Sequence, residues 1–413
     1  MTKDYPWRSV LNDELHSRPS IYFDAPAVVW HEAFFVGNET TRVPDTLLKL
    51  GLKNTSDGKS GIAQTTSGRI KWEIHAEFVS LTYVIQWSGD YNAIPLREEI
   101  WIKLVNEMPG QRINSIEIVV GLAGTHDAKL MLGAETDTDV AVSAIGNCDA
   151  EIWSTFRFNE ANATRFVLLN HNLNAFRTGR MVRRLLEIED YRLMALISLP
   201  LAQDTFARCS EFETRLQTIV DALGKEAHQQ ERLLKDLAQL ASEILDVSVN
   251  TGERFSATAA YAELVFARLA ELREQHVDGY QRLGVFIERR FRPAIRFCAQ
   301  ASRRVENSAT RVARASDLLR TSVQVELEQQ NLQLLESMEK RVQVQTKLQE
   351  AVEGFSIVAI SYYAIGLYKT LLESLSHVEV ISGLKTLLTL VGFPVIILAV
   401  WYLVRRAKKL THL

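Results

Sequence analysis

The chain changes its pattern of hydrophobic and polar positions along its length, and each pattern predicts a different structure. Up to about residue 175, apolar and β-branched residues alternate with polar ones or form short runs, which is typical of strands. These runs cover residues 27–36, 72–87, 113–121, 139–145 and 152–158. A helical pattern lies at 95–108, and the Ser/Thr/Gly-rich segment 54–68 indicates a loop. Residues 1–178 are therefore predicted to form a mixed α/β domain.

The following segments are helical in pattern. Residues 179–292 predict amphipathic helices that pack as a bundle, with breaks expected at Pro200, Gly224 and Thr251-Gly252. Between Pro293 and Gly354 the sequence contains no further proline or glycine. This favours one very long stalk helix over 293–354, which would be about 90 Å long.

One face of the predicted stalk helix is apolar at heptad-type spacing. Such a face is typical of a seam against neighbouring helices, and it contains Leu327, Leu334, Met338, Leu348, Val352 and Phe355. Asn331, Arg341 and Gln345 fall on the same face. Polar residues at seam positions fix the register or the oligomeric state. In a ring of helices they would instead line a water-filled axis, and both interpretations remain open.

The last part of the chain predicts a transmembrane hairpin over 355–413. Two predominantly apolar runs, about 354–372 and 386–404, are long enough to cross a bilayer as helices. The tail after the second run carries four basic residues, whereas Lys385 is the single lysine or arginine in the connection at 370–385. Positive charge favours the cytoplasmic side. Both termini are therefore expected in the cytoplasm, and the first thirty residues contain no signal-peptide pattern.

Charge and cysteine content exclude some classes of partner and of site. The net charge is −3, and residues 1–175 alone carry −7, so no nucleic-acid partner is expected. The three cysteines lie far apart, which excludes a disulfide scaffold and a cysteine zinc site. The predicted fold class is α+β, in a protein of the bacterial inner membrane whose mass lies mostly in the cytoplasm.

Two groups of residues are candidate ligand or metal sites. Asp13, Glu14, His16 and Arg18 lie within one short segment and suit a metal or an anionic ligand, or else a hydrogen-bonded structural anchor. Glu187 and Asp190 share a helix face and suit a cation at a subunit boundary, or else ion pairs with neighbouring arginines. The sequence holds no GxSxG or HExxH motif, so an enzyme is not predicted.

The order of these segments resembles the CorA architecture of two-span cation transporters. In that family five subunits surround a pore, and an external loop after a Gly-Met-Asn motif selects hydrated divalent cations. The resemblance implies a homo-pentamer in the lipid bilayer that transports Mg, Zn, Mn, Co or Ni ions. Gly366 stands where the motif glycine is expected, but no asparagine follows, and Lys369 lies near the mouth. Glu373 and Glu379 would supply an acidic ring, or act as solvated loop acids.

Three motifs resemble a bacterial family known as uncharacterised membrane-anchored proteins. They are LNDELHSRPS at 11–20, LLEIEDYRLMAL at 185–196 and LQEAVEGFSIVAISYY at 348–363. This resemblance spans the whole chain and implies a membrane location, without assigning an activity.

Three functions are consistent with these features. The first is a homo-oligomeric channel or transporter for a divalent cation, with a cytoplasmic sensing domain. The second is a membrane-anchored scaffold or sensor whose cytoplasmic domain binds an unidentified protein, and the third is an anchored enzyme acting through the segment 13–18. In the first case the candidate ion path contains Asn331, Arg341, Gln345, Glu353, Tyr363, Gly366, Lys369, Glu373 and Glu379.

Overall fold

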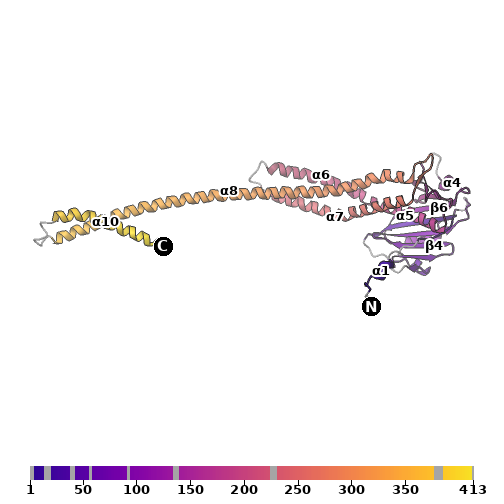
Figure 1. The fold of residues 1–413 in the computed structure, drawn as a ribbon, viewed down its shortest axis with the longest axis horizontal. Coiled ribbons are helices and arrows are strands. Elements are labelled where there is room, and N and C mark those ends of the chain that lie inside the picture. The colour runs from indigo at the N-terminus through magenta and orange to yellow at the C-terminus, as the bar shows by residue number, and fades with distance from the viewer. Residues whose placement is uncertain are drawn as a thin grey trace. The chain divides into compact units, whose positions relative to one another are not determined.

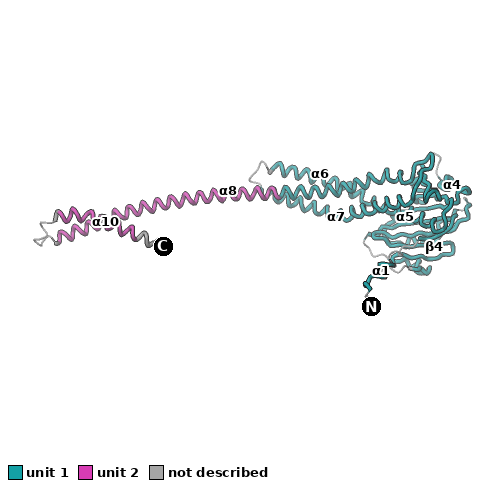
Figure 2. Tube along the Cα trace, in the orientation of Figure 1, with its two compact units in different colours: residues 1–316 teal, residues 317–413 magenta. Residues whose placement is uncertain are grey.

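The protein consists of two compact units, residues 1–316 and residues 317–413 (Figure 2). The computed structural model describes residues 4–13, 20–37, 42–54, 58–90, 94–133, 139–223, 230–375 and 385–411. The first unit combines the segment predicted as an α/β domain with the helical segment that follows it, and the predicted α+β class is confirmed.

A mixed sheet forms the centre of the first unit (Figure 1). Within the described residues its strands are ordered β10-β7-β8-β9-β6-β1-β5-β4-β3-β2. The pairing of β6 with β9 is parallel, and the other neighbouring strands are antiparallel. The strands are β1 (Ala27–Phe35), β2 (Lys53–Asn54), β3 (Ser60–Gln64), β4 (Gly68–Ile74), β5 (Phe78–Gln86), β6 (Gln111–Leu122), β7 (Ala141–Ile145), β8 (Ala150–Phe158), β9 (Thr164–Asn170) and β10 (Gln275–His276).

Helices cover both faces of the sheet. Because successive side chains of a strand point to opposite faces, each central strand contributes to two cores. In β1, Val28 and Trp30 belong to a core shared with α2 (Asp45–Lys49), α3 (Glu99–Glu107) and α4 (Ala128–Leu132). Val29 and Ala33 belong to a second core. That core is shared with α5 (Ala175–Leu196), α7 (Gln230–Glu271) and the start of α8 (Leu283–Leu375). Both cores consist of fully buried residues, so the sheet is the middle of three layers.

The sequence patterns predicted most strands and misjudged one loop. The runs at 27–36 and 113–121 correspond to β1 and β6, and the run at 72–87 covers parts of β4 and β5. The loop predicted at 54–68 is wrong, since β3 occupies Ser60–Gln64 and pairs with β4. Ser60 and Ala63 are buried there, and small buried residues produce little hydrophobic signal in a sequence.

Two predicted helix boundaries are also wrong. No break occurs at Thr251-Gly252, because α7 continues through both residues and the Thr251 hydroxyl donates to the carbonyl of Val247 at 2.7 Å. The long helix begins at Leu283, before Pro293, because Leu283 and Phe291 are buried in the core beside α5. Such packing overrides the local preference against proline. Helix α6 (Ser198–Leu223) holds Pro200 in its first turn, where proline is tolerated, and Gly224 lies outside the described residues.

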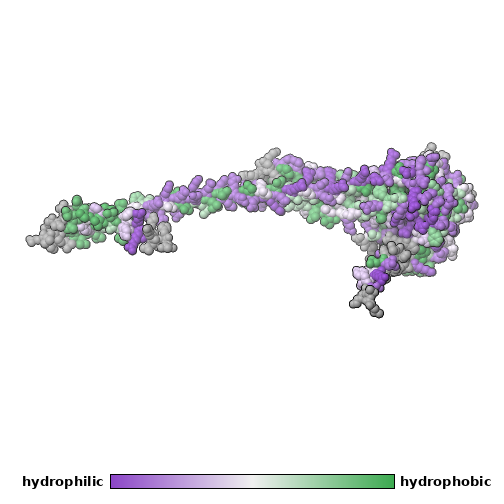
Figure 3. All heavy atoms as spheres, viewed as in Figure 1, coloured by the Kyte–Doolittle hydropathy of each residue, from purple (hydrophilic) through white to green (hydrophobic). Residues whose placement is uncertain are grey.

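The second unit contains the end of α8 and α10 (Lys385–Thr411). Each contains a segment long and apolar enough to cross a membrane, and Figure 3 shows the hydrophobic side chains gathered on them. The hydroxyl of Tyr368 donates to the Leu388 carbonyl at 3.0 Å. A Cβ atom at Gly392 would come within 2.5 Å of the Tyr368 ring, so the two helices touch at a glycine.

The three cysteines differ in their access to solvent. Cys148 is exposed, whereas Cys209 on α6 and Cys298 on α8 are buried. Burial raises the pKa of both the Cys209 and the Cys298 thiol.

The close packing of α5 gives a test of the first unit. A Cβ atom at Gly179 would lie 2.1 Å from the backbone oxygen of Ile21, whereas one at Gly252 on α7 meets no atom within 4 Å. We therefore expect Gly179→Ala to lower the free energy of unfolding by about 1–3 kcal/mol. Gly252→Ala, the matched control, should raise it by roughly 0.5–1 kcal/mol. Thermal melting of the full-length variants measures both effects, and equal melting temperatures for the two variants would contradict this packing.

Candidate functional site

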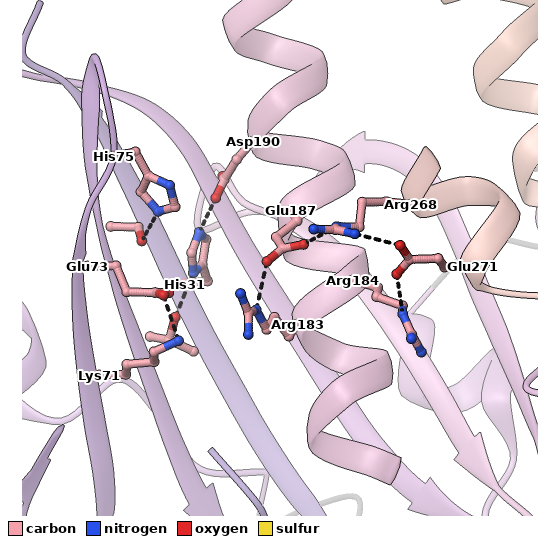
Figure 4. Close-up of polar contacts among 12 residues, drawn as sticks. His31, Lys71, Glu73, His75, Arg183, Arg184, Glu187, Asp190, Arg268 and Glu271 are labelled. Carbon is pink, nitrogen blue, oxygen red and sulfur yellow. Dashed lines mark hydrogen bonds and ion pairs between the residues drawn. The ribbon is translucent and has the colours of Figure 1, made fainter. Parts of the chain in front are cut away.

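A cluster of polar side chains is buried between α5 and the sheet (Figure 4). We call it the α5 polar cluster. It joins strands β1, β4, β5 and β6 to α5 and α7, and it contains His31, Lys71, Glu73, Thr82, Asn114, Arg183, Glu187, Asp190 and Arg268.

Asp190 on α5 receives hydrogen bonds from two strands. Its Oδ2 lies 2.9 Å from Nε2 of His31 on β1, and its Oδ1 accepts from Nδ2 of Asn114 on β6 at 2.8 Å. His31 Nδ1 lies 2.9 Å from the hydroxyl oxygen of Thr82 on β5. The donor and acceptor roles depend on the tautomer of His31: with its proton on Nε2, the ring donates to the Asp190 carboxyl group and accepts from the Thr82 hydroxyl at Nδ1. Each of these four side chains is buried and has a hydrogen-bond partner.

Lys71 and Glu73 form a buried ion pair on β4. They lie two residues apart on one face of the strand, with Nζ 2.7 Å from Oε1. Burial lowers the pKa of Lys71, and nearby Glu73 opposes that shift. Burial also disfavours the Glu73 carboxylate, but the charge and hydrogen bond of Lys71 outweigh it, so the pKa of Glu73 is lowered. The charged pair therefore depends on both partners.

Glu187 continues the cluster toward α7. It accepts from Nε of Arg183 at 2.7 Å and forms an ion pair with Arg268 of α7. Arg268 also pairs with Glu271 at 2.6 Å, and Glu271 accepts from Arg184 at 2.9 Å. Alternating charges thus connect α5 to α7 at the edge of the core.

The space inside the cluster is small. A cavity of about 30 Å³ lies among His31, Glu73, His75 and Asp190, which is room for one or two ordered water molecules. Within the part of the chain that the structure describes, no three His, Cys, Asp or Glu side chains lie close enough together to hold a metal ion. The arrangement fixes α5 on the sheet and leaves no space for an organic substrate.

A second buried carboxylate lies on the opposite face of the sheet. Glu32 on β1 is fully buried and accepts from the Ser115 hydroxyl at 3.0 Å. Arg97 lies 3.3 Å away. Burial raises the pKa of Glu32, although these neighbours oppose the shift. Buried polar contacts that include a carboxyl group are therefore present on both faces of β1.

The residues that the sequence predicted as sites lie in different parts of the structure. Glu187 and Asp190 both lie in the α5 polar cluster, with Asp190 facing the sheet and Glu187 facing arginines. Asp13 is the last residue of α1 (Arg8–Asp13), while Glu14, His16, Arg18 and Glu379 lie outside the described residues. The other candidate path residues, Asn331, Arg341, Gln345, Glu353, Tyr363, Gly366, Lys369 and Glu373, all lie on α8.

Several members of the cluster were not singled out from the sequence. Lys71 and Glu73 alternate with Ile70 and Trp72 in a short strand, so the strand buries both its apolar and its charged face. Alternation of charged and apolar residues indicates buried charge only in a strand whose sheet is covered on both faces. Asn114 and Arg268 carry no local signal, because their partner residues lie far away in the sequence.

The buried pair on β4 gives a double-variant test. We expect Lys71→Met to lower the free energy of unfolding by about 3–5 kcal/mol, because it leaves the buried Glu73 carboxylate unpaired. Lys71→Met/Glu73→Leu should recover most of that loss. Without Lys71, the burial that raises the pKa of Glu73 loses its strongest opposing charge, so we expect this pKa to rise in the variant. The deficit of the single variant should therefore be largest at neutral pH and shrink as the pH falls toward about 4. Denaturant melts of full-length protein at two pH values measure this, and an equally unstable double variant would contradict it.

Comparison with known proteins points to one family. A family model described as "Protein of unknown function (DUF3422)" matches residues 3–411. No match is found among curated proteins or among solved structures. The comparisons do not show the resemblance to CorA. Since the match spans nearly the whole chain, the protein belongs to this family of unknown function, which confirms the predicted membership of an uncharacterised family.

Proposed function

We propose that this protein is a homo-oligomeric channel or transporter of the bacterial inner membrane that conducts a divalent metal cation. In this proposal the α8 helices of five copies surround an axis. The first unit, which contains the sheet and is called the sheet unit below, lies in the cytoplasm as a sensing domain. The observation that carries the proposal is a wide face on α8, uncharged except at Glu328 and Arg341, that continues into the first span.

Between Leu327 and Phe355, the heptad positions place charge on one side of α8. Six of the eight charged residues in this segment occupy positions b, c and f, and the exceptions are Glu328 and Arg341. Positions a, d, e and g form a contiguous face, roughly half of the circumference. The flanking positions e and g hold Leu335, Val342 and Val344, which are 59–67% exposed in the single chain. The other flanking residues are Ala351 and the polar Glu328, Gln330, Ser337 and Gln349.

A face of this width indicates contact with two neighbours. In two-stranded coiled coils, positions a and d are buried and positions e and g usually carry charges. A helix in a ring touches one copy on each side, so its flanks must be apolar as well. Exposed apolar surface of this extent marks an interaction site, and its continuous helical form fits a second copy of the same helix.

The first span presents an open face in line with this surface. Ser361 and Leu372 are buried in the second unit, and Tyr368 bonds to α10, so these residues mark the side that α10 covers. With 3.6 residues per turn, Tyr363, Gly366 and Glu373 fall on the opposite side of the helix. Tyr363 is 72% exposed, and nothing lies within 4 Å of a Cβ atom built at Gly366. If α10 faces lipid in the assembly, this open face borders the axis.

The charges on that face support a cation near its end. Glu373 from each copy would form an acidic ring, and rings of acidic residues select cations. Gly366 lies about two helical turns earlier, and its missing side chain leaves room beside the axis at that level. The basic residues at the end of α10 support a cytoplasmic location for both ends of the hairpin.

One observation favours a second candidate, a membrane-anchored scaffold that does not transport. Arg341 occupies a seam position, so an assembled stalk holds a ring of guanidinium groups, and Lys369 adds positive charge beside the span. Rings of arginine or lysine oppose cation passage. In this alternative the polar seam residues fix the register of the oligomer, and the sheet unit binds a protein partner.

Assembly through the uncharged face is tested by native mass spectrometry in mild detergent. We expect a pentamer of the 46.8 kDa chain. Leu334→Glu, at a seam position, should dissociate it because it places a charge inside the helix interface. Leu332→Glu is the matched control: its side chain is 62% exposed, against 58% for Leu334, but it lies at position b. A wild-type monomer or dimer, or dissociation by both variants alike, would refute the ring.

Transport is tested by dye-reported influx of Mg²⁺, Zn²⁺, Mn²⁺, Co²⁺ or Ni²⁺ into liposomes that contain the full-length oligomer. We expect influx of at least one ion and a loss of roughly tenfold in Glu373→Gln, because the acidic ring is removed. Glu350→Gln, which removes an exposed carboxylate at position f, is the control and should transport normally. An intact pentamer that passes none of the five ions would leave the scaffold as the function.

A further inference from the structure

A separate pocket opens in the first unit where β8, the end of α5 and the first turns of α8 meet. It has a volume of about 360 Å³, within the range of sites that bind small organic molecules. Its apolar wall is made by Phe156, Leu196, Phe286, Ile287 and Phe291. The α5 polar cluster shares none of these side chains.

Phe156 is held in the pocket wall by an unusual backbone conformation. Its φ is 55°, in the left-handed region that bulky residues rarely adopt, and it lies where the register of β8 against β9 shifts. The Ser154 hydroxyl accepts from the Phe156 amide at 3.1 Å and donates to the Arg165 carbonyl at 2.9 Å, which fixes the bulge. Strained residues of this kind gather at ligand-binding sites.

The bulge turns the Phe156 ring onto α8. Its centroid lies 4.7 Å from that of Phe286, with an angle of 10° between the planes. Arg290 continues the stack, with its guanidinium carbon 3.9 Å from the centroid of Phe286. The wall is therefore a layer of flat groups, against which another flat group can stack.

The rim of the pocket is positively charged. Arg157, Arg192 and Arg290 line it together with Asp139. Arg192 is neutralised by Glu189, which accepts two hydrogen bonds at 2.6 and 3.0 Å. Within the described residues, neither Arg157 nor Arg290 forms an ion pair, so these two positive charges outnumber the one carboxylate of Asp139.

We propose that this pocket binds a small organic anion with a flat apolar body, such as an aromatic carboxylate, sulfonate or phosphate. The apolar body packs against the apolar wall of the pocket, and the anionic group pairs with Arg157 and Arg290. Neither transport nor assembly is needed for this binding, so it is independent of the proposed function.

Three probes distinguish the contribution of the anionic group to binding from that of the flat apolar body. Isothermal titration calorimetry on the full-length protein in lipid nanodiscs, with empty nanodiscs as the blank, uses 2-naphthalenesulfonate, 2-naphthol and inorganic sulfate. We expect saturable binding of 2-naphthalenesulfonate, one per chain, with a Kd on the order of 0.1 mM. The other two probes should bind at least tenfold more weakly, because each lacks the charge or the ring. Equal binding of sulfate would show an anion site without an apolar half, and equal binding of 2-naphthol an apolar cleft, and either result overturns the proposal.

Arginine variants locate the site. Arg157→Gln and Arg290→Gln should each weaken 2-naphthalenesulfonate binding by roughly tenfold, since a hydrogen bond to a charged group is lost. Arg289→Gln is the control, because Arg289 is an exposed neighbour on α8 that does not line the pocket. Both Arg157 and Arg290 are exposed, so the fold should survive, and melting temperatures check this. Unchanged binding in Arg157→Gln, or equal weakening in Arg289→Gln, would refute the assignment.

Discussion

The first unit depends on the burial of the Asp190 carboxylate between α5 and the sheet. A buried carboxyl group is tolerated only when its hydrogen bonds are satisfied, and Asp190 finds its partners on β1 and β6. Because both partners belong to adjacent strands, one rotation and one height of α5 satisfy the carboxylate. The same rotation places Gly179 against the backbone of Ile21 and Glu187 against Arg268. Tight packing at one end of α5 and ion pairs on its outer side thus follow from the position of a single carboxylate.

The sequence predicted the elements that show a repeating pattern, but it did not predict the contacts between segments that lie far apart along the chain. The strands with strong alternation and the helical segment follow from periodicity, because burial on one face imposes it. Both apolar spans follow from the length of their uncharged runs. Strand β3 and the continuity of α7 were misjudged, since small residues and an isolated glycine give a weak or misleading local signal. The sequence placed Glu187 and Asp190 on one face of a helix. That His31 and Asn114 would meet Asp190 depends on the pairing of β1 with β6, two strands that lie far apart in the sequence.

The two units differ in how much of their apolar side chains they expose. The first buries its large apolar side chains on both faces of the sheet, including Trp30, Trp72 and Trp101. The second leaves apolar residues exposed along a whole helix, and few of its side chains are buried. Two segments of the second unit are long and apolar enough to cross a membrane, and the apolar side chains of 327–355 are exposed in the single chain. The first unit gains its stability from its own core, whereas in the proposed assembly the second would gain it from association and bilayer insertion.

The distribution of the cysteines has a practical consequence for spectroscopy. Alkylating reagents attack the thiolate, and the two buried cysteines are both sheltered and raised in pKa. Cys148 lies exposed in the turn between β7 and β8. The natural sequence thus offers one reactive thiol per chain for a fluorophore or a spin label. In an assembly of identical copies, the distances between those labels would report the symmetry of the sheet units without any engineered residue.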